Sequence, residues 1–333
     1  MYLKTLSILF AVLIAVFVLN GGAVEACLWT YGTDVHGHRI ETTESGGAGY
    51  IIHLTEMKSH YVDLIKRLPS LATAAKTGDH EAQTNYAVAL IVKGETDRGI
   101  ELLKDIESQR PGLYETAANL GTAYELKGDD QQALHWIEEG MRRNKQSHEG
   151  TEWIHVKILQ TKLKLKEQPD WLERHSVLNL DFGDNRFLSE PILAGTGLPN
   201  NINGLKEVHD ALEYQLMERL ALVDPPDAIV GDLLFDLGNL NALVSSLESA
   251  IPAYELAMKY GTTRGGLARA RVDYLSDLIH RGALREMDSS PVPYVYWPFI
   301  SLMVILAAAV LILLVLLVIL FLRVRKMRAR TVD

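Results

Sequence analysis

The sequence predicts an all-α protein: an α-solenoid of stacked helix-turn-helix units with a short N-terminal extended segment, an irregular central loop region and a C-terminal transmembrane helix. Three observations predict this class. Helical periodicity of apolar residues begins near Thr55 and then continues. The region from His80 to Ser147 matches itself at a shift of 34 residues, a period typical of paired helices. Residues 299–322 form an apolar run long enough to cross a bilayer.

The first 26 residues have the pattern of a secretory signal peptide. Lys4 precedes an apolar run from Leu6 to Leu19, and small residues then lead to a cleavage site after Ala26. The only cysteine, Cys27, follows that site, so an internal disulfide is excluded. Two interpretations of Cys27 stay open: a lipidated N-terminus, as in bacterial lipoproteins, or a lone thiol after ordinary cleavage.

The C-terminal end predicts a single membrane crossing. Phe299 to Leu322 carries no charge, and a helix of that length measures about 36 Å. A stalk over residues 288–298 brings aromatic side chains to the membrane interface, and the basic tail 323–333 is expected in the cytoplasm by the positive-inside rule. The sequence therefore predicts a single-pass protein of the inner (cytoplasmic) membrane, with its main domain in the periplasm or outside the cell.

The charge of the exported part excludes one class of partner. The terminal segments hold six of the 33 basic and two of the 42 acidic residues, which leaves a net charge of about −13 between them. Nucleic acid is not expected to bind so acidic a domain.

Residues 27–54 are predicted to be an N-terminal extended segment. Tyr50-Ile51-Ile52 has high strand propensity and suggests a small hairpin. If Asp34, His36 and His38 lie on one strand, alternate side chains share a face and form a weak candidate metal site. The alternative is a solvated polar loop.

Small residues recur at matching places in the two units of the repeat. Ala87 pairs with Gly121 where two helices cross closely, and Gly94 pairs with Gly128 at the turn between helices. Gly99 and Ala133 allow the second helix to approach the first, and Pro111 ends the first unit.

These residues resemble the tetratricopeptide-repeat (TPR) family. The resemblance covers two repeats near residues 80–113 and 114–147, within a helical domain over 55–167. A third stretch, Gly231 to Arg264, resembles the same motif through Leu237-Gly238, Ala250, Tyr254 and Ala257, but Ser245 replaces the turn glycine and Pro252 falls early in its second helix.

Between these blocks the pattern changes. Glycine, proline and asparagine residues mark residues 168–204 as an irregular loop region, and residues 205–287 are predicted to be a second helical, TPR-like region. Either one solenoid carries an inserted loop, or two small repeat blocks are hinged there.

The resemblance implies a concave groove that binds extended peptides, and no cofactor. Asn85 and Asn119 hold equivalent places on the first helices, where an amide both donates to and accepts from a peptide backbone. Nearby groove positions by the same resemblance are Val88, Ile91, Thr122 and Glu125. Asp236 stands at this place in the third unit and interrupts the row. The alternative is that these asparagines are only solvated.

No phosphate-binding, serine-hydrolase or zinc-protease motif occurs. His148, Glu149, Glu152 and His155 either cluster or serve as charges favourable to a helix start. The predicted function is a scaffold or adaptor that binds partner proteins. The alternative is an assembly factor or chaperone for exported proteins, and a less favoured one is an enzyme using Asp181, Asp184 and Glu190 in the loop region.

Overall fold

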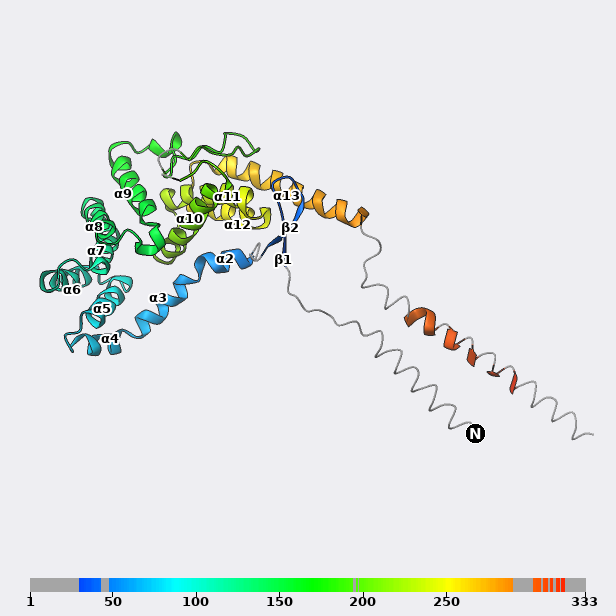
Figure 1. Ribbon diagram of the computed structural model, residues 1–333, viewed down its shortest axis with the longest axis horizontal. Coiled ribbons are helices and arrows are strands. Elements are labelled where there is room, and N and C mark those ends of the chain that lie inside the picture. Colours follow the sequence, from blue (N-terminus) through cyan, green and yellow to red (C-terminus); the bar gives the residue numbers. More distant parts are fainter. Residues whose placement is uncertain are drawn as a thin grey trace, which may run out of the picture. The chain divides into compact units, whose positions relative to one another are not determined.

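Helices make up nearly all the regular structure in the computed structural model of the chain, as the all-α prediction requires (Figure 1). The structure describes residues 30–42, 48–193, 196, 198–289 and short helical stretches between 302 and 320.

The region with the 34-residue period consists of two helical hairpins. Helices α5 (His80–Val92) and α6 (Thr96–Gln109) form the first, and α7 (Tyr114–Lys127) and α8 (Asp130–Arg143) form the second. Gly94 and Gly128 both have positive φ, at 93° and 86°, as a left-handed turn between helices requires. A Cβ on Gly121 would lie 2.6 Å from Ile137 Cγ1, so a small residue is necessary at this crossing.

A third antiparallel pair follows later in the chain. It consists of α11 (Ala228–Val244) and α12 (Leu247–Tyr260). A Cβ on Gly238, which was predicted to lie at a helix crossing, would lie 2.8 Å from the ring of Tyr254 on the second helix, so the two helices do cross closely there. The turn has no glycine; instead, the Ser246 side chain caps α12 by accepting a hydrogen bond from the Ser249 N–H.

Helices α9 (Glu152–Glu167) and α10 (Ile202–Leu222) lie between these pairs, and α13 (Gly265–Ser289) follows them (Figure 1). Two apolar clusters form the interior. One joins α5 to α8 and includes Leu159 of α9, and the other joins the loop region to α10–α13 and includes Ile154 and Ile158 of α9. The two clusters therefore meet along α9, and the loop region is part of the second core rather than a hinge between blocks.

The N-terminal segment differs from the prediction. Strands β1 (Thr30–Thr33) and β2 (Arg39–Thr42) form an antiparallel hairpin, but Tyr50, Ile51 and Ile52 lie in helix α2 (Ala48–Thr55). Tyr50 and Leu54 are four residues apart on one helical face and both are buried, and the Tyr50 hydroxyl lies 2.7 Å from Glu213 Oε1. Burial against α10 thus outweighs the strand propensity of the three residues.

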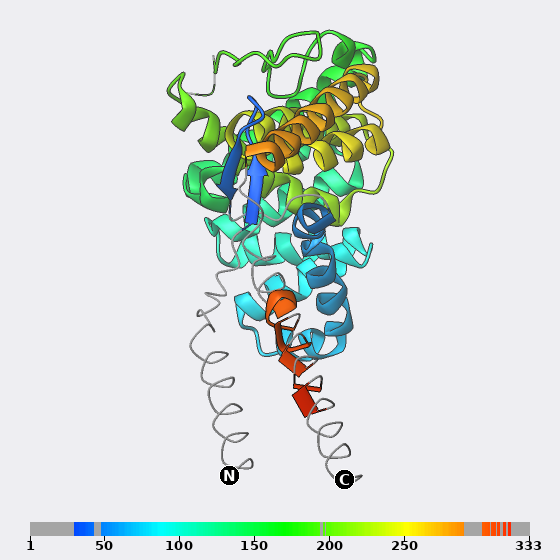
Figure 2. The same cartoon turned by 90° about the vertical axis from the view of Figure 1, so that its right-hand side faces the viewer.

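Two more short helices lead from α2 to the first hairpin. They are α3 (Met57–Lys66) and α4 (Leu68–Ala75), and both views show them following α2 as a string of short helices (Figures 1 and 2). Helix α3 contacts α10 as well as α5, so it connects the first helical hairpin to helix α10.

The described residues of the predicted loop region 168–204 are irregular apart from a 3-10 helix at Trp171–Glu173, but the last three, 202–204, already belong to α10. Apolar side chains of this region are nevertheless buried, among them Leu172, Val177, Leu178, Leu180, Phe182 and Leu193.

Several predicted segments lie outside the described residues. These are the signal peptide 1–26, Cys27, stalk residues 290–298 and the tail 323–333; α13 includes the first two residues of the predicted stalk. The predicted membrane helix 299–322 is described only in short stretches. Within the described part of the chain, no helix combines the length and the apolar character needed to span a bilayer.

Candidate protein-binding surface

The two asparagines of the predicted groove lie on the first helix of each hairpin. Asn85 is exposed on α5 and Asn119 is half-buried on α7. Neither side-chain amide has a hydrogen-bond partner among the described residues, so both are free to bind an external group. Val88 and Thr122 are half-buried beside them. These four residues make up the open surface, the name used below for this part of the predicted groove.

Ile91 was predicted to line the groove, but it belongs to the core. It is 6% exposed and packs within the cluster that joins α5 to α8. The close approach of α6 at Gly99 places that helix directly against the Ile91 side chain.

Glu125 was also predicted to line the groove, but it is buried in a network of charges. Its Oε1 accepts from Arg219 Nη1 of α10 at 2.8 Å and lies 2.7 Å from Lys162 Nζ of α9. Its Oε2 lies 2.7 Å from His155 Nε2. Burial alone would raise the Glu125 pKa, but Arg219 and His155 hold that pKa well below its usual range.

The network continues along the start of α9. Glu152 lies 3.2 Å from His155 Nδ1 and also bonds to His148. Burial opposes ionisation of Glu152, yet its two histidine partners lower its pKa to about 2. Burial likewise opposes the charged form of His155, but Glu125 raises the net pKa of that imidazole. Glu149 takes no part in this network. Of the four residues for which the sequence suggested a cluster, only His148, Glu152 and His155 therefore form one.

This network closes one end of the predicted groove. Thr122 and Glu125 line a cavity of only about 50 Å³ together with residues of α9 and α10. The end of α10 thus lies where a peptide was expected, and the open surface ends at Thr122. The sequence carries no sign of this closure because Arg219 is 94 positions from Glu125.

A larger cavity of about 470 Å³ was also not predicted. It lies beside α9 and α10, and the residues that line it are His53, Glu149, Gly150, Thr151, Trp153, Leu198, Glu207, Asp210, Ala211, Glu213, Tyr214 and Met217. Four carboxylates and two aromatic rings favour a positively charged group over an anion.

The candidate metal ligands lie in the turn of the N-terminal hairpin, not on a strand. The Asp34 carboxylate accepts from the His36 and His38 backbone N–H groups at 2.9 and 2.7 Å. Strand alternation therefore does not apply to these residues, and Asp34 serves to shape the turn. No group of three or more metal-ligating side chains occurs among the residues that the structure describes.

The three acidic residues of the loop region were the candidates for an enzyme site. Asp181, Asp184 and Glu190 are all exposed, and Asp181 accepts from the Gly183 N–H at 2.9 Å. Their exposure leaves all three solvated, which is the ordinary state of loop carboxylates.

Comparison with known proteins gives no family: no protein-family model matches the chain, and no curated protein matches it.

Proposed function

We propose that this chain is a membrane-anchored scaffold or adaptor outside the cytoplasm, which binds partner proteins through the open surface of a TPR-like array. The observation that carries the proposal is the pair of free amides at Asn85 and Asn119, one on each successive hairpin. An amide that has no internal partner offers a donor and an acceptor to the backbone of an extended peptide.

Two further features support it. Stacked helical pairs expose extended surfaces suited to binding rather than to catalysis. The apolar run over 299–322 and the basic tail after it are the sequence features of a single membrane anchor.

The proposal is tested by crosslinking and affinity capture of the full chain from membranes, with wild type compared with an Asn85→Ala, Asn119→Ala double variant. We expect the double variant to lose the partner that wild type captures. A matched control is Glu101→Ala with Gln131→Ala, which truncates two exposed side chains on the second helices α6 and α8. An identical set of partners for all three forms would refute a role of the asparagines.

The alternative function, an assembly factor for exported proteins, uses the same surface with different kinetics. A chaperone releases its client, so rapid dissociation from wild type would favour it, whereas a scaffold keeps a standing complex.

A further inference from the structure

The cavity of about 470 Å³ beside α9 and α10 is large enough for a small organic ligand. Four carboxylates line it, those of Glu149, Glu207, Asp210 and Glu213. Neither a lysine nor an arginine is among the described residues of its lining. The cavity is therefore a place of concentrated negative charge.

Two histidines are the basic partners of these carboxylates within the described part of the chain. His53 Nε2 lies 3.9 Å from Glu213 Oε2, and His209 Nδ1 lies 2.8 Å from Asp210 Oδ1. Even if both imidazoles were protonated, they would offset only two of the four negative charges. A net negative charge therefore remains for a cation from outside.

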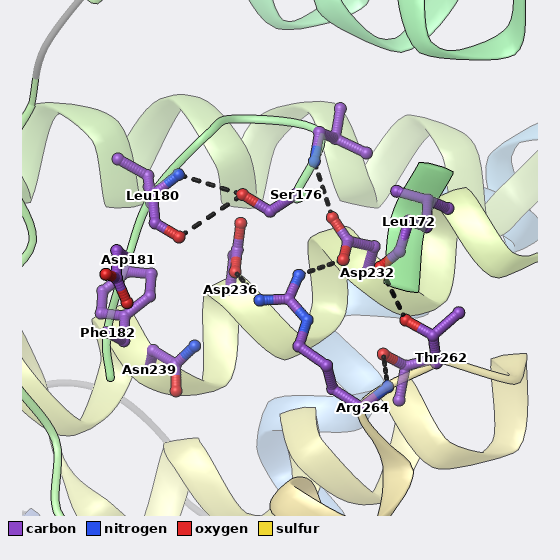
Figure 3. A network of polar contacts seen from close by, with 12 residues as sticks. Leu172, Ser176, Leu180, Asp181, Phe182, Asp232, Asp236, Asn239, Thr262 and Arg264 are labelled. Carbon is purple, nitrogen blue, oxygen red and sulfur yellow. Dashed lines mark hydrogen bonds and ion pairs between the residues drawn. The ribbon is translucent and has the colours of Figure 1, made fainter. Parts of the chain in front are cut away.

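Buried carboxylates elsewhere in the same unit are matched by internal arginines. Glu125 pairs with Arg219. Asp232 pairs with Arg264, and Figure 3 shows the Arg264 guanidinium between the carboxylates of Asp232 and Asp236. The fold thus supplies arginines to the carboxylates of its interior. The cavity differs because its carboxylates have no such internal partner among the residues described.

Three of the four carboxylates form a row on α10. Glu207, Asp210 and Glu213 are three residues apart, so they share a face, and the row is about 9 Å long at 1.5 Å per residue. Glu207 and Asp210 are exposed. Glu213 is held in place, because the buried Tyr50 hydroxyl donates to its Oε1 at 2.7 Å. A row of separated charges matches a ligand with several separated cationic groups better than it matches one ion.

Two aromatic rings complete the lining of the cavity. Trp153 of α9 and Tyr214 of α10 are both half-buried, and Met217 adds an apolar contact. Burial first, and the carboxylates of Glu218 and Glu149 next, raise the pKa of Tyr214 to about 12, so the phenol stays neutral in a negative field. Aromatic faces attract ammonium groups, and apolar side chains pack against methylene chains.

We propose that this cavity binds a linear polyamine, an organic cation with two or more ammonium groups on a methylene chain. The ammonium groups bind along the α10 row, and the chain packs against Trp153 and Tyr214. This ligand goes beyond the proposed protein-binding function, and its site is separate from Asn85 and Asn119. Lysine side chains of a partner protein carry the same ammonium chemistry, so the test includes both sources.

Isothermal titration calorimetry of the full chain in detergent, with spermidine as the probe, measures this binding. We expect saturable binding to one site. Putrescine should bind roughly tenfold more tightly than N-acetylputrescine, because acetylation removes one of its two charges. No saturable binding of spermidine, or equal displacement of spermidine by magnesium at the same ionic strength, would overturn the proposal. A capped Gly-Lys-Gly-Lys-Gly peptide that binds more tightly than spermidine would also overturn it, and would assign the cavity to a partner protein.

Two matched double variants separate a specific site from the net charge of the chain. Glu207→Gln with Asp210→Asn should weaken spermidine binding by at least roughly tenfold, because two charge-assisted bonds are lost. Glu101→Gln with Asp105→Asn removes the same charge from α6 and should leave the affinity unchanged within about twofold. All four side chains are exposed, so the helical circular dichroism signal should stay that of wild type in both variants. Equal weakening in the two variants would refute a specific site.

The aromatic contact has its own test. Tyr214→Leu should weaken spermidine binding by about threefold, whereas Tyr214→Phe keeps the ring and should bind like wild type. Equal affinities of the two variants would contradict packing against the ring. The Asn85→Ala, Asn119→Ala chain should bind spermidine like wild type, so failure of this proposal is distinct from failure of the proposed function.

Discussion

Removal of the Glu125 carboxylate is the most direct test of the buried charge network. The change Glu125→Gln keeps the size of the side chain but removes the counter-ion of Arg219, whose side chain is 9% exposed. Arg219 Nε is already buried without a hydrogen-bond partner, so the loss of the Glu125 carboxylate leaves this buried guanidinium still less satisfied. Breaking a buried pair in this way costs about 3–5 kcal/mol, and the remaining amide oxygen of glutamine favours the lower end.

Urea unfolding followed by circular dichroism measures this loss. With a slope of about 3 kcal/mol/M, a loss of about 3 kcal/mol lowers the midpoint by about 1 M. The control is Asp170→Asn, which removes an ion pair to Arg174 whose side chains are 55% and 74% exposed, and should cost at most about 1 kcal/mol.

The pH dependence gives a second readout of the same network. The folded-state pKa of Glu125 lies below its ordinary value of 4.5, so its stabilisation is present above that pH and is lost as pH falls toward the folded-state pKa. The difference between wild type and Glu125→Gln should therefore shrink in acid. Adding Arg219→Met should recover part of the loss, because an apolar side chain needs no counter-ion. A loss no larger than that of the Asp170→Asn control, or one that does not change in acid, would refute the reasoning.

Two further changes probe the interior by other means. Gly121→Val should destabilise the chain by roughly 1–3 kcal/mol because the new side chain overlaps Ile137. The control Gly266→Ala should not destabilise it, because a Cβ there meets nothing within 4 Å. Equal urea midpoints for the two variants would contradict this prediction. Asp236→Asn should raise the urea midpoint, and more at pH 8 than at pH 4. Burial first, and Asp232 second, raise the Asp236 pKa well above 3.8, so the wild type loses stability as pH rises from that value to the folded-state pKa while asparagine does not titrate. An equal gain at both pH values would show that Asp236 does not titrate in the folded protein.

The helical pairs could be predicted from the sequence because their determinants are local. Gly94 and Gly128 supply the left-handed turns, and Gly121 supplies the close crossing, at positions set by the 34-residue period. The equivalent places of Asn85 and Asn119 on the first helices follow from the same period. The helix containing Tyr50 was missed because its conformation depends on burial against α10, which local propensity does not reveal.

By itself, the sequence determined the all-helical class, the two repeat hairpins and the irregular character of residues 168–201, since each follows from periodicity, turn residues or helix-breaking residues within a few positions. The tertiary structure alone decided that α10 pairs with Glu125 at one end of the predicted groove and that residues 176–185 pack beside α11. In both arrangements a single charged side chain, Arg219 or Asp232, bonds to a residue that is 94 or 55 positions away in the sequence. Their pairing depends on the path of an irregular segment, and no periodic pattern in the sequence specifies that path.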